Sequence, residues 1–120
     1  MHETLELPED PAAALEVLRA ASSKTPVLVF KRSPICPVSH RAEAQVRKYL
    51  DGLTESDRLL VVDIDVIDER ALARGLTAEL GIAHESPQAL WFKDAELAWH
   101  GSHGALTATR FAELARGEFQ

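Results

Sequence analysis

The sequence predicts an α/β fold in which a central mixed sheet is flanked by helices. Two short apolar runs rich in β-branched residues, 27–31 and 59–65, are each followed by a segment of helical periodicity, a pattern typical of parallel strands buried on both faces. Two further strand-like runs, 89–93 and 97–100, are separated by only three residues, which predicts an antiparallel hairpin. We therefore expect a four-stranded sheet.

Helices complete the expected order of elements. Apolar residues at helical spacing predict them over residues 11–22, 37 to about 50, 69–80 and 107–116. Asp10 can cap the first helix and Pro11 fits its first position. Gly81 is a stop signal for the third helix, and Thr107 can cap the fourth. The resulting order, helix, strand, helix, strand, helix, two strands and helix, is that of the thioredoxin fold.

Length, composition and charge narrow the class of protein. The 120 residues suffice for one domain spanning residues 1–120, of which residues 1–10 are a candidate flexible N-terminus. No stretch approaches the roughly 18 apolar residues of a membrane span, and no secretory signal is visible, so we expect no membrane partner. A net charge of −6 argues against a nucleic acid partner. With a single cysteine no internal disulfide can form, and we expect a cytoplasmic location where thiols stay reduced.

That cysteine, Cys36, lies where the first strand should end and the second helix should begin. A thiol at a helix N-terminus meets unpaired backbone N–H groups and the positive end of the helix dipole, and both favour the nucleophilic thiolate. Pro37 fits the first helical position. A lone cysteine is more often a small buried hydrophobe, but Cys36 lies between Pro34 and Pro37 in a turn that solvent should reach. The placement predicts a reactive thiol.

Ser39 stands where a C-x-x-C motif would carry its second cysteine. A serine cannot close a disulfide, so an oxidised Cys36 must be resolved by a thiol from outside the chain. Ser39 can donate a hydrogen bond to the Cys36 sulfur from its hydroxyl or its N–H, although it would equally fit as an ordinary first-turn serine.

Pro87 precedes the third predicted strand, where thioredoxin-like folds hold a cis-proline against the active cysteine. The backbone before that proline is left free to pair with an extended substrate, which makes Ser86 a candidate binding residue. The fold favours the cis isomer, whereas an isolated X-Pro bond is cis only about 5–6% of the time.

Basic residues and histidines gather in the same part of the chain. Residues 31–48 carry five basic residues against one acidic residue, a net +4 in an acidic chain, and the last two, Arg47 and Lys48, are expected to form a solvated helix face. His84, His100 and His103 do not have the spacing of common zinc ligands, so no metal is expected.

Three segments resemble the YtxJ-type monothiol bacilliredoxins, a thioredoxin-fold family of bacteria that use the thiol bacillithiol. The segments are Lys-Arg-Ser-x-x-Cys-Pro-Val-Ser at 31–39, His-Glu-Ser-Pro-Gln at 84–88 and Trp-His-Gly-Ser-His at 99–103. The similarity spans roughly residues 24–115, with the segments in order and at matching spacing. Members typically carry Thr-Cys-Pro-Ile-Ser, whereas this chain has Ile35 and Val38 at the two variable positions, and the first change removes a hydroxyl beside the thiol.

The resemblance implies a thiol-disulfide oxidoreductase that removes bacillithiol from S-bacillithiolated client proteins. Cys36 would attack the mixed disulfide, take up bacillithiol and release the client thiol, and free bacillithiol or a reductase would regenerate it. The malate group of bacillithiol carries two carboxylates, so the nearby cations are expected to hold it and to favour the thiolate. The implied catalytic residues are Cys36, Pro37 and Ser39, and the implied substrate-binding residues are Lys31, Arg32, His40, Arg41, Ser86, Pro87, Ser102 and His103.

Two interpretations of other classes stay open. One is a non-enzymatic thioredoxin-like binding module or thiol sensor, against which the intact Cys-Pro-x-Ser motif beside basic residues argues. The other is a monothiol glutaredoxin-like protein that uses glutathione and could share an iron–sulfur cluster between subunits. The thiol that exchanges with Cys36 distinguishes among the three.

Overall fold

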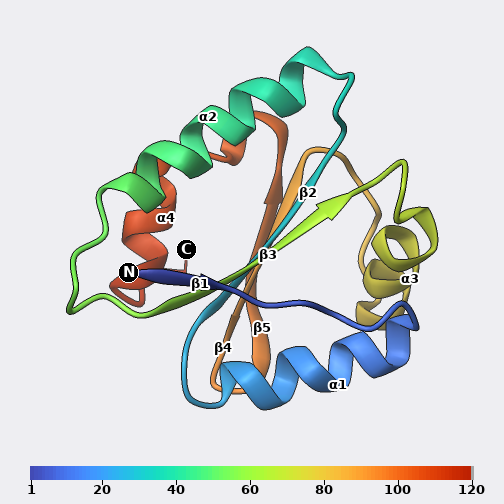
Figure 1. Cartoon of the computed structure of the whole chain (residues 1–120), viewed down its shortest axis with the longest axis horizontal. Helices are drawn as coiled ribbons and strands as arrows, with labels where there is room; N and C mark the ends of the chain where they lie inside the picture. Colours follow the sequence, from blue (N-terminus) through green and yellow to red (C-terminus); the bar gives the residue numbers. More distant parts are fainter. Residues whose placement is uncertain (120) are drawn as a thin grey trace.

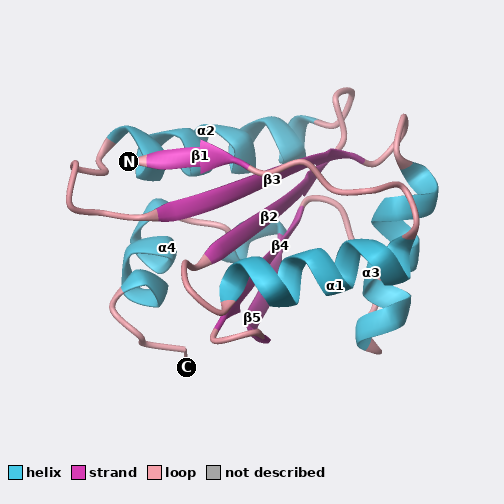
Figure 2. Cartoon of the chain, turned by 60° about the horizontal axis from the view of Figure 1, so that its bottom comes forward, coloured by secondary structure: helices cyan, strands magenta, loops and turns pink. Residues whose placement is uncertain are grey.

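A five-stranded mixed sheet with helices on both faces forms the structure, a computed structural model that describes residues 1–119 (Figures 1 and 2). The elements are β1 (His2–Thr4), α1 (Pro11–Ser22), β2 (Val27–Arg32), α2 (Pro37–Asp51), β3 (Leu59–Asp65), α3 (Arg70–Leu80), β4 (Gln88–Lys93), β5 (Glu96–Ser102), the 3-10 turn η1 (His103–Ala105) and α4 (Ala108–Ala115). The strand order is β1-β3-β2-β4-β5. Strands β1, β3 and β2 are parallel, and β4 is antiparallel to both β2 and β5.

Two hydrophobic cores lie on the two faces of the sheet. Successive strand residues point to opposite faces, so Val27 and Val29 pack with α1 and α3, while Leu28 and Phe30 pack with α2 and α4. All four side chains are buried. This double burial explains why β2 and β3 are continuous apolar runs in the sequence.

Local signals set the helix ends much as expected. The Asp10 carboxylate accepts a hydrogen bond from the Ala13 N–H at 3.0 Å, and the Thr107 hydroxyl accepts one from the Arg110 N–H at 3.1 Å. Helix α3 ends at Gly81, whose φ of 72° is the left-handed conformation that favours glycine.

The fifth strand, β1, was not predicted. Its residues lie in the segment expected as a candidate flexible N-terminus, yet His2–Thr4 pair in parallel with residues 59–61 of β3. All three side chains are exposed, so no apolar pattern marks the strand in the sequence. Leu5 and Leu7, which follow it, pack against the core beneath α1 and α3.

Two local expectations were wrong. The hairpin between β4 and β5 turns on two residues rather than three, because Asp94 and Ala95 both adopt positive φ angles, 54° and 66°, as a tight type I′ turn requires. Val38 is one of the apolar residues at helical spacing that predict α2, and this spacing would place it on the buried face of the helix, yet it is 41% exposed. Figure 1 shows why, since the first turn of α2 extends past the end of the sheet.

Three loops meet at one end of the sheet. Lys31 of β2 pairs with Gln88 of β4, and Gln88 pairs with Ser102 of β5. The segment leaving β2, the segment entering β4 and the segment leaving β5 therefore lie side by side, at the upper end of the sheet in Figure 1. Among the described residues, no helix is both long and apolar enough to cross a bilayer.

Candidate functional site

Cys36 is the residue immediately before α2. Its backbone is extended, with φ −101° and ψ 123°, and Pro37 takes the first helical position as expected. The Cys36 carbonyl accepts the first helical hydrogen bond, from the His40 N–H at 3.1 Å. The N–H groups of the first turn have no carbonyl partner within the helix, and Cys36, whose thiol is half-exposed, directly precedes them.

These donors lower the pKa of the Cys36 thiol below its ordinary value. The Ser39 N–H lowers this pKa most and the Val38 N–H follows, desolvation opposes them, and the Ser39 hydroxyl makes the smallest contribution to the lowering. No charged side chain contributes, although the sequence suggested that the basic cluster would favour the thiolate. The thiolate is stabilised by the start of the helix itself.

Ser39 connects the thiol to the loop before it. The residue is only 1% exposed, and its hydroxyl oxygen accepts a hydrogen bond from the Ser33 N–H at 3.0 Å. The hydroxyl proton is not used in this contact, and the Ser39 hydroxyl contributes to the lowered pKa of the Cys36 thiol. An ordinary first-turn serine would face solvent, so the burial of Ser39 supports a role beside the thiol.

The Ser86-Pro87 bond is cis, as the fold led us to expect. In register, Arg32 lies opposite Pro87, because Lys31 pairs with Gln88 in the antiparallel β2–β4 ladder. The cis peptide thus borders the segment that leads to Cys36. The Ser86 hydroxyl oxygen is buried without a hydrogen-bond partner in residues 1–119.

Ser102 and His103 adjoin the loop that contains Ser86 and Pro87. The Ser102 hydroxyl donates to Glu85 Oε2 at 2.7 Å, and the His103 N–H donates to the Pro87 carbonyl at 3.1 Å. The His103 side chain is exposed, and its φ of 52° turns the chain out of β5 into η1. The structure therefore brings together four of the predicted substrate-binding residues, Ser86, Pro87, Ser102 and His103.

The predicted cations are used in different ways. Arg32 is committed to Asp63, with its Nε 2.9 Å from Oδ1 and its Nη2 3.0 Å from Oδ2. His40 Nε2 donates to the Pro34 carbonyl at 2.9 Å and folds back on the thiol loop. Arg41 is exposed and makes no ion pair within the described chain. Only Arg41 is thus unengaged and near the start of α2.

Lys31 is not at the thiol, which corrects its predicted role as a malate contact. Its side chain is 0% exposed and points to the α1 and α3 face of the sheet, whereas α2 covers the other face. The Nζ atom lies 2.8 Å from His84 Nδ1 and donates to Gln88 Oε1 at 2.7 Å. Sequence reasoning missed His84 and Gln88 as partners, because they lie 53 and 57 residues away along the chain.

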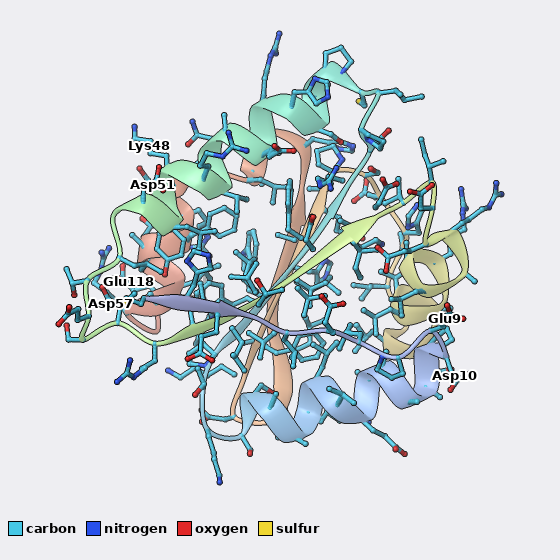
Figure 3. All side chains as sticks on the ribbon, in the orientation of Figure 1. Glu9, Asp10, Lys48, Asp51, Asp57 and Glu118 are labelled. Carbon is cyan, nitrogen blue, oxygen red and sulfur yellow. The ribbon has the colours of Figure 1, made fainter. Side chains whose placement is uncertain are left out.

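Arg47 and Lys48, the other two basic residues of the segment 31–48, lie toward the C-terminal end of α2. Figure 3 labels Lys48 beside Asp51 at the C-terminal end of that helix, about 18 Å along the axis from residue 36 at 1.5 Å per residue. A groove of about 600 Å³ between α2 and β3 includes Arg32 and Arg47 but not Cys36. No three His, Cys, Asp or Glu side chains within residues 1–119 are grouped as a metal site requires.

Comparisons with known proteins agree with this geometry. A family model described as monothiol bacilliredoxin BrxC matches residues 10–111. A solved structure described as a proposed oxidoreductase with a thioredoxin fold is 27% identical, with a TM-score of 0.69 over 96% of this chain and 93% of the other. Thioredoxin O2 from Arabidopsis thaliana in its oxidised state is 15% identical, with a TM-score of 0.62 over 99% and 95% of the two chains. Reduced desulfothioredoxin from Desulfovibrio vulgaris Hildenborough is 18% identical, with a TM-score of 0.59 over 82% and 88%. The last two show the fold alone.

Proposed function

We propose, because this chain belongs to the monothiol bacilliredoxin BrxC family, that it removes bacillithiol from S-bacillithiolated proteins through Cys36. The observation that best supports this proposal is the state of the Cys36 thiol. It is half-exposed, its pKa is lowered by the first turn of α2, and the chain has no second cysteine with which it could form a disulfide. Such a site suits exchange with an external mixed disulfide.

In the first step the Cys36 thiolate attacks the bacillithiol sulfur of the client's mixed disulfide. An S–S bond forms between Cys36 and bacillithiol while the client's S–S bond breaks, and the electron pair leaves on the client sulfur as a thiolate. No net oxidation occurs, because one disulfide replaces another.

In the second step a thiol from outside the chain attacks Cys36-bound bacillithiol. With a second bacillithiol as the attacking thiolate, the products are bacillithiol disulfide and the Cys36 thiolate. Ser39 cannot take this part, so the chain depends on a thiol that is supplied in solution. The proposal places the protein in the cytoplasm, where such thiols are kept reduced.

The site residues divide into two groups in this proposal. Pro37 and Ser39 set the helix start that favours the thiolate. Ser86 presents its backbone to an extended client segment, since neither its N–H nor its C=O has a hydrogen-bond partner in the described chain. His103 borders the loop that contains Ser86, because its backbone N–H donates to the Pro87 carbonyl.

Arg41 is the cation that we assign to the malate carboxylates. It lies on the second turn of α2, is exposed, and has no acidic partner among residues 1–119, while Arg32 is held by Asp63. His40, its neighbour, contributes a ring N–H that is directed to Pro34 in the free protein. An exposed contact of this kind is worth up to about 1 kcal/mol.

The test is transfer from two donors. One client protein, carrying either bacillithiol or glutathione as a mixed disulfide, is incubated with the reduced chain, and the mass of the adduct on Cys36 is measured. We expect preferential uptake of bacillithiol, with none in Cys36→Ser. Arg41→Ala should narrow the preference by up to about fivefold, whereas Arg47→Ala on the same helix should not.

The outcomes separate the competing functions. Equal transfer from both donors would remove the bacillithiol assignment and leave a general monothiol oxidoreductase. Transfer from neither would favour a binding module.

A further inference from the structure

Lys31 is the one charged side chain among the buried residues of the described chain. Burying an ammonium group costs several kcal/mol unless its protons are well paired. An apolar side chain would fill the same place near the end of β2 without that cost. The hydrogen bonds of the amine, not its packing, therefore distinguish lysine at this position.

The first partner, Gln88, fastens the loop that precedes it. Its Oε1 accepts from Lys31 Nζ at 2.7 Å and from the Glu85 N–H at 3.3 Å, while its Nε2 donates to the Ala83 carbonyl at 3.0 Å. Lys31 can donate only to the oxygen of the amide, so it selects the orientation in which both loop contacts form. Residues 83–87, which we call the 83–87 loop, are held by this one side chain at two points.

The second partner, His84, belongs to the loop itself. Its Nδ1 lies 2.8 Å from Lys31 Nζ. Desolvation first, then the charges of Lys31, Arg74 and Arg70, lower the pKa of His84, against an opposing effect of the Ala73 backbone. A neutral ring keeps the Nδ1 lone pair free to accept from the amine.

We propose that Lys31 is a positioning residue for client binding, whose amine holds the 83–87 loop, through Gln88 and His84, in the shape that presents the Ser86 backbone to an extended client segment. The inference rests on the proposed function, because it takes this loop as the place where the client pairs. Lys31 touches neither the thiol nor the client. Its contribution is to reduce the number of conformations that the loop must lose when a client binds.

The test compares the wild-type protein with Lys31→Met on two kinds of substrate. A cysteine-containing peptide, carrying bacillithiol or glutathione, offers a backbone that can pair with Ser86, whereas hydroxyethyl disulfide offers none. We expect KM for both peptide substrates to rise about tenfold with kcat unchanged. The rate with hydroxyethyl disulfide and the pH dependence of Cys36 alkylation should not change. Lys48→Met, an exposed lysine on α2, is the matched control and should match the wild type.

A second variant separates positioning from stability. Lys31→Met leaves Gln88 Oε1 with only its contact to the Glu85 N–H at 3.3 Å, whereas the double variant Lys31→Met with Gln88→Leu removes both buried polar side chains, together with the contacts of Gln88 to Glu85 and Ala83. We expect the double variant to regain thermal stability while its KM stays raised. Amide hydrogen exchange of residues 83–88 should be faster in both variants.

Three results would overturn the proposal: a wild-type KM in Lys31→Met, parallel recovery of stability and KM in the double variant, or an altered Cys36 alkylation profile. If Lys31→Met does not fold, His84→Ala, which removes one half-exposed partner, takes its place with a smaller expected rise. If the wild-type protein accepts only the glutathionylated peptide, the bacillithiol assignment fails, but Lys31 is still judged on that peptide.

Discussion

The reactivity of Cys36 arises from residues next to it in the chain. The Ser39 N–H, the Val38 N–H and the Ser39 hydroxyl lower the thiol's pKa, and they do so because the helix starts one residue after the cysteine. Cations supply none of this effect. The site is therefore tuned by backbone dipoles, which keep their place whatever the salt concentration.

Replacing Ser39 with alanine should raise the Cys36 pKa toward that of a free cysteine. The rise should be partial, because the backbone N–H of residue 39, the larger influence, is retained. Alkylation rate against pH measures the thiolate fraction. The half-buried Ser33 N–H also loses its acceptor, so the free energy of unfolding should fall by about 1 kcal/mol. Ser33→Ala, which keeps every donor to the sulfur, serves as the control, and an unchanged profile in Ser39→Ala would show that the hydroxyl has no part.

Lys31 should make the protein more stable as the solution becomes alkaline. Desolvation, with a further effect of Arg74 and a partial opposition from Glu85, lowers its pKa from 10.5 to about 8. Between these two values the unfolded chain binds more protons than the folded one, so the free energy of unfolding rises with pH over this window. Relative to Lys31→Met, the wild type should gain on the order of 2–3 kcal/mol from pH 7 to pH 10.5.

Urea unfolding at a series of pH values measures this difference. His84, Glu85 and Arg74 face the amine, Arg70 acts on His84, and all four are present in both proteins, so their own titration largely cancels. Lys48→Met should keep the wild-type slope. Parallel curves for the wild type and Lys31→Met would mean that the amine is not desolvated.

Among the elements, α1 and α3 make an unusually close contact under the sheet. A Cβ atom on Gly75 of α3 would lie 2.3 Å from Cγ and 2.8 Å from Cβ of Pro11, the first residue of α1. Glycine here is a requirement of packing, since the residue lies inside a helix, where it otherwise costs about 1 kcal/mol relative to alanine.

Gly75→Ala should therefore destabilise the protein despite its better helix propensity. Moving α1 away from α3 disturbs Leu72, Leu76 and Leu18 in the core they share, at a net cost of about 1–3 kcal/mol. The measurement is the free energy of unfolding in urea. Gly52→Ala, where the new Cβ meets nothing closer than 3.5 Å and φ is −86°, should be neutral or slightly stabilising. Equal effects at both positions would rule out the packing explanation.

At the scale of the whole molecule, the sheet brings the functional loops together at one end, and a short strand, β1, covers the edge that β3 would otherwise form. The ladder from β2 through β4 to β5 aligns the three loops around Cys36 at one end. At the far edge, the short β1 covers β3 through backbone pairing. A short edge strand of this kind limits pairing with other chains.

Removing residues 2–7 should weaken the fold and expose the β3 edge. The variant loses the pairing of β1, the hydrogen bond from the Leu5 N–H to the Val61 carbonyl at 2.8 Å, and the packing of Leu5 and Leu7. We expect a loss of about 2–4 kcal/mol in the free energy of unfolding, and more self-association in size-exclusion chromatography. Replacing the exposed His2 and Glu3 with alanine keeps the backbone pairing and should have little effect. A deletion as stable as the wild type would show that β1 is dispensable.

Much of the fold could be predicted because its signals are local. Helix α1 and strand β3 have the expected bounds, since a cap and a proline mark the former and a continuous apolar run marks the latter. The residues of β1 carry no local signal for a strand, because their side chains are exposed. They form a strand only because β3 offers its backbone as a partner. Strand pairing between distant segments is decided by the partner.

The sequence by itself determined that Cys36 precedes a helix, that Ser39 replaces a resolving cysteine, and that the chain carries the motifs of its family. The first two properties depend on residues within about one helical turn of each other, and the motifs can be identified in the sequence without knowing their contacts. The tertiary structure alone decided that Lys31 is buried with His84 and Gln88, that Arg32 is neutralised by Asp63, and that Arg41 makes no ion pair within the described chain. The reason is physical: the face to which a strand residue points, and the charge it meets there, depend on partners some 30 to 60 residues away that only folding brings into contact.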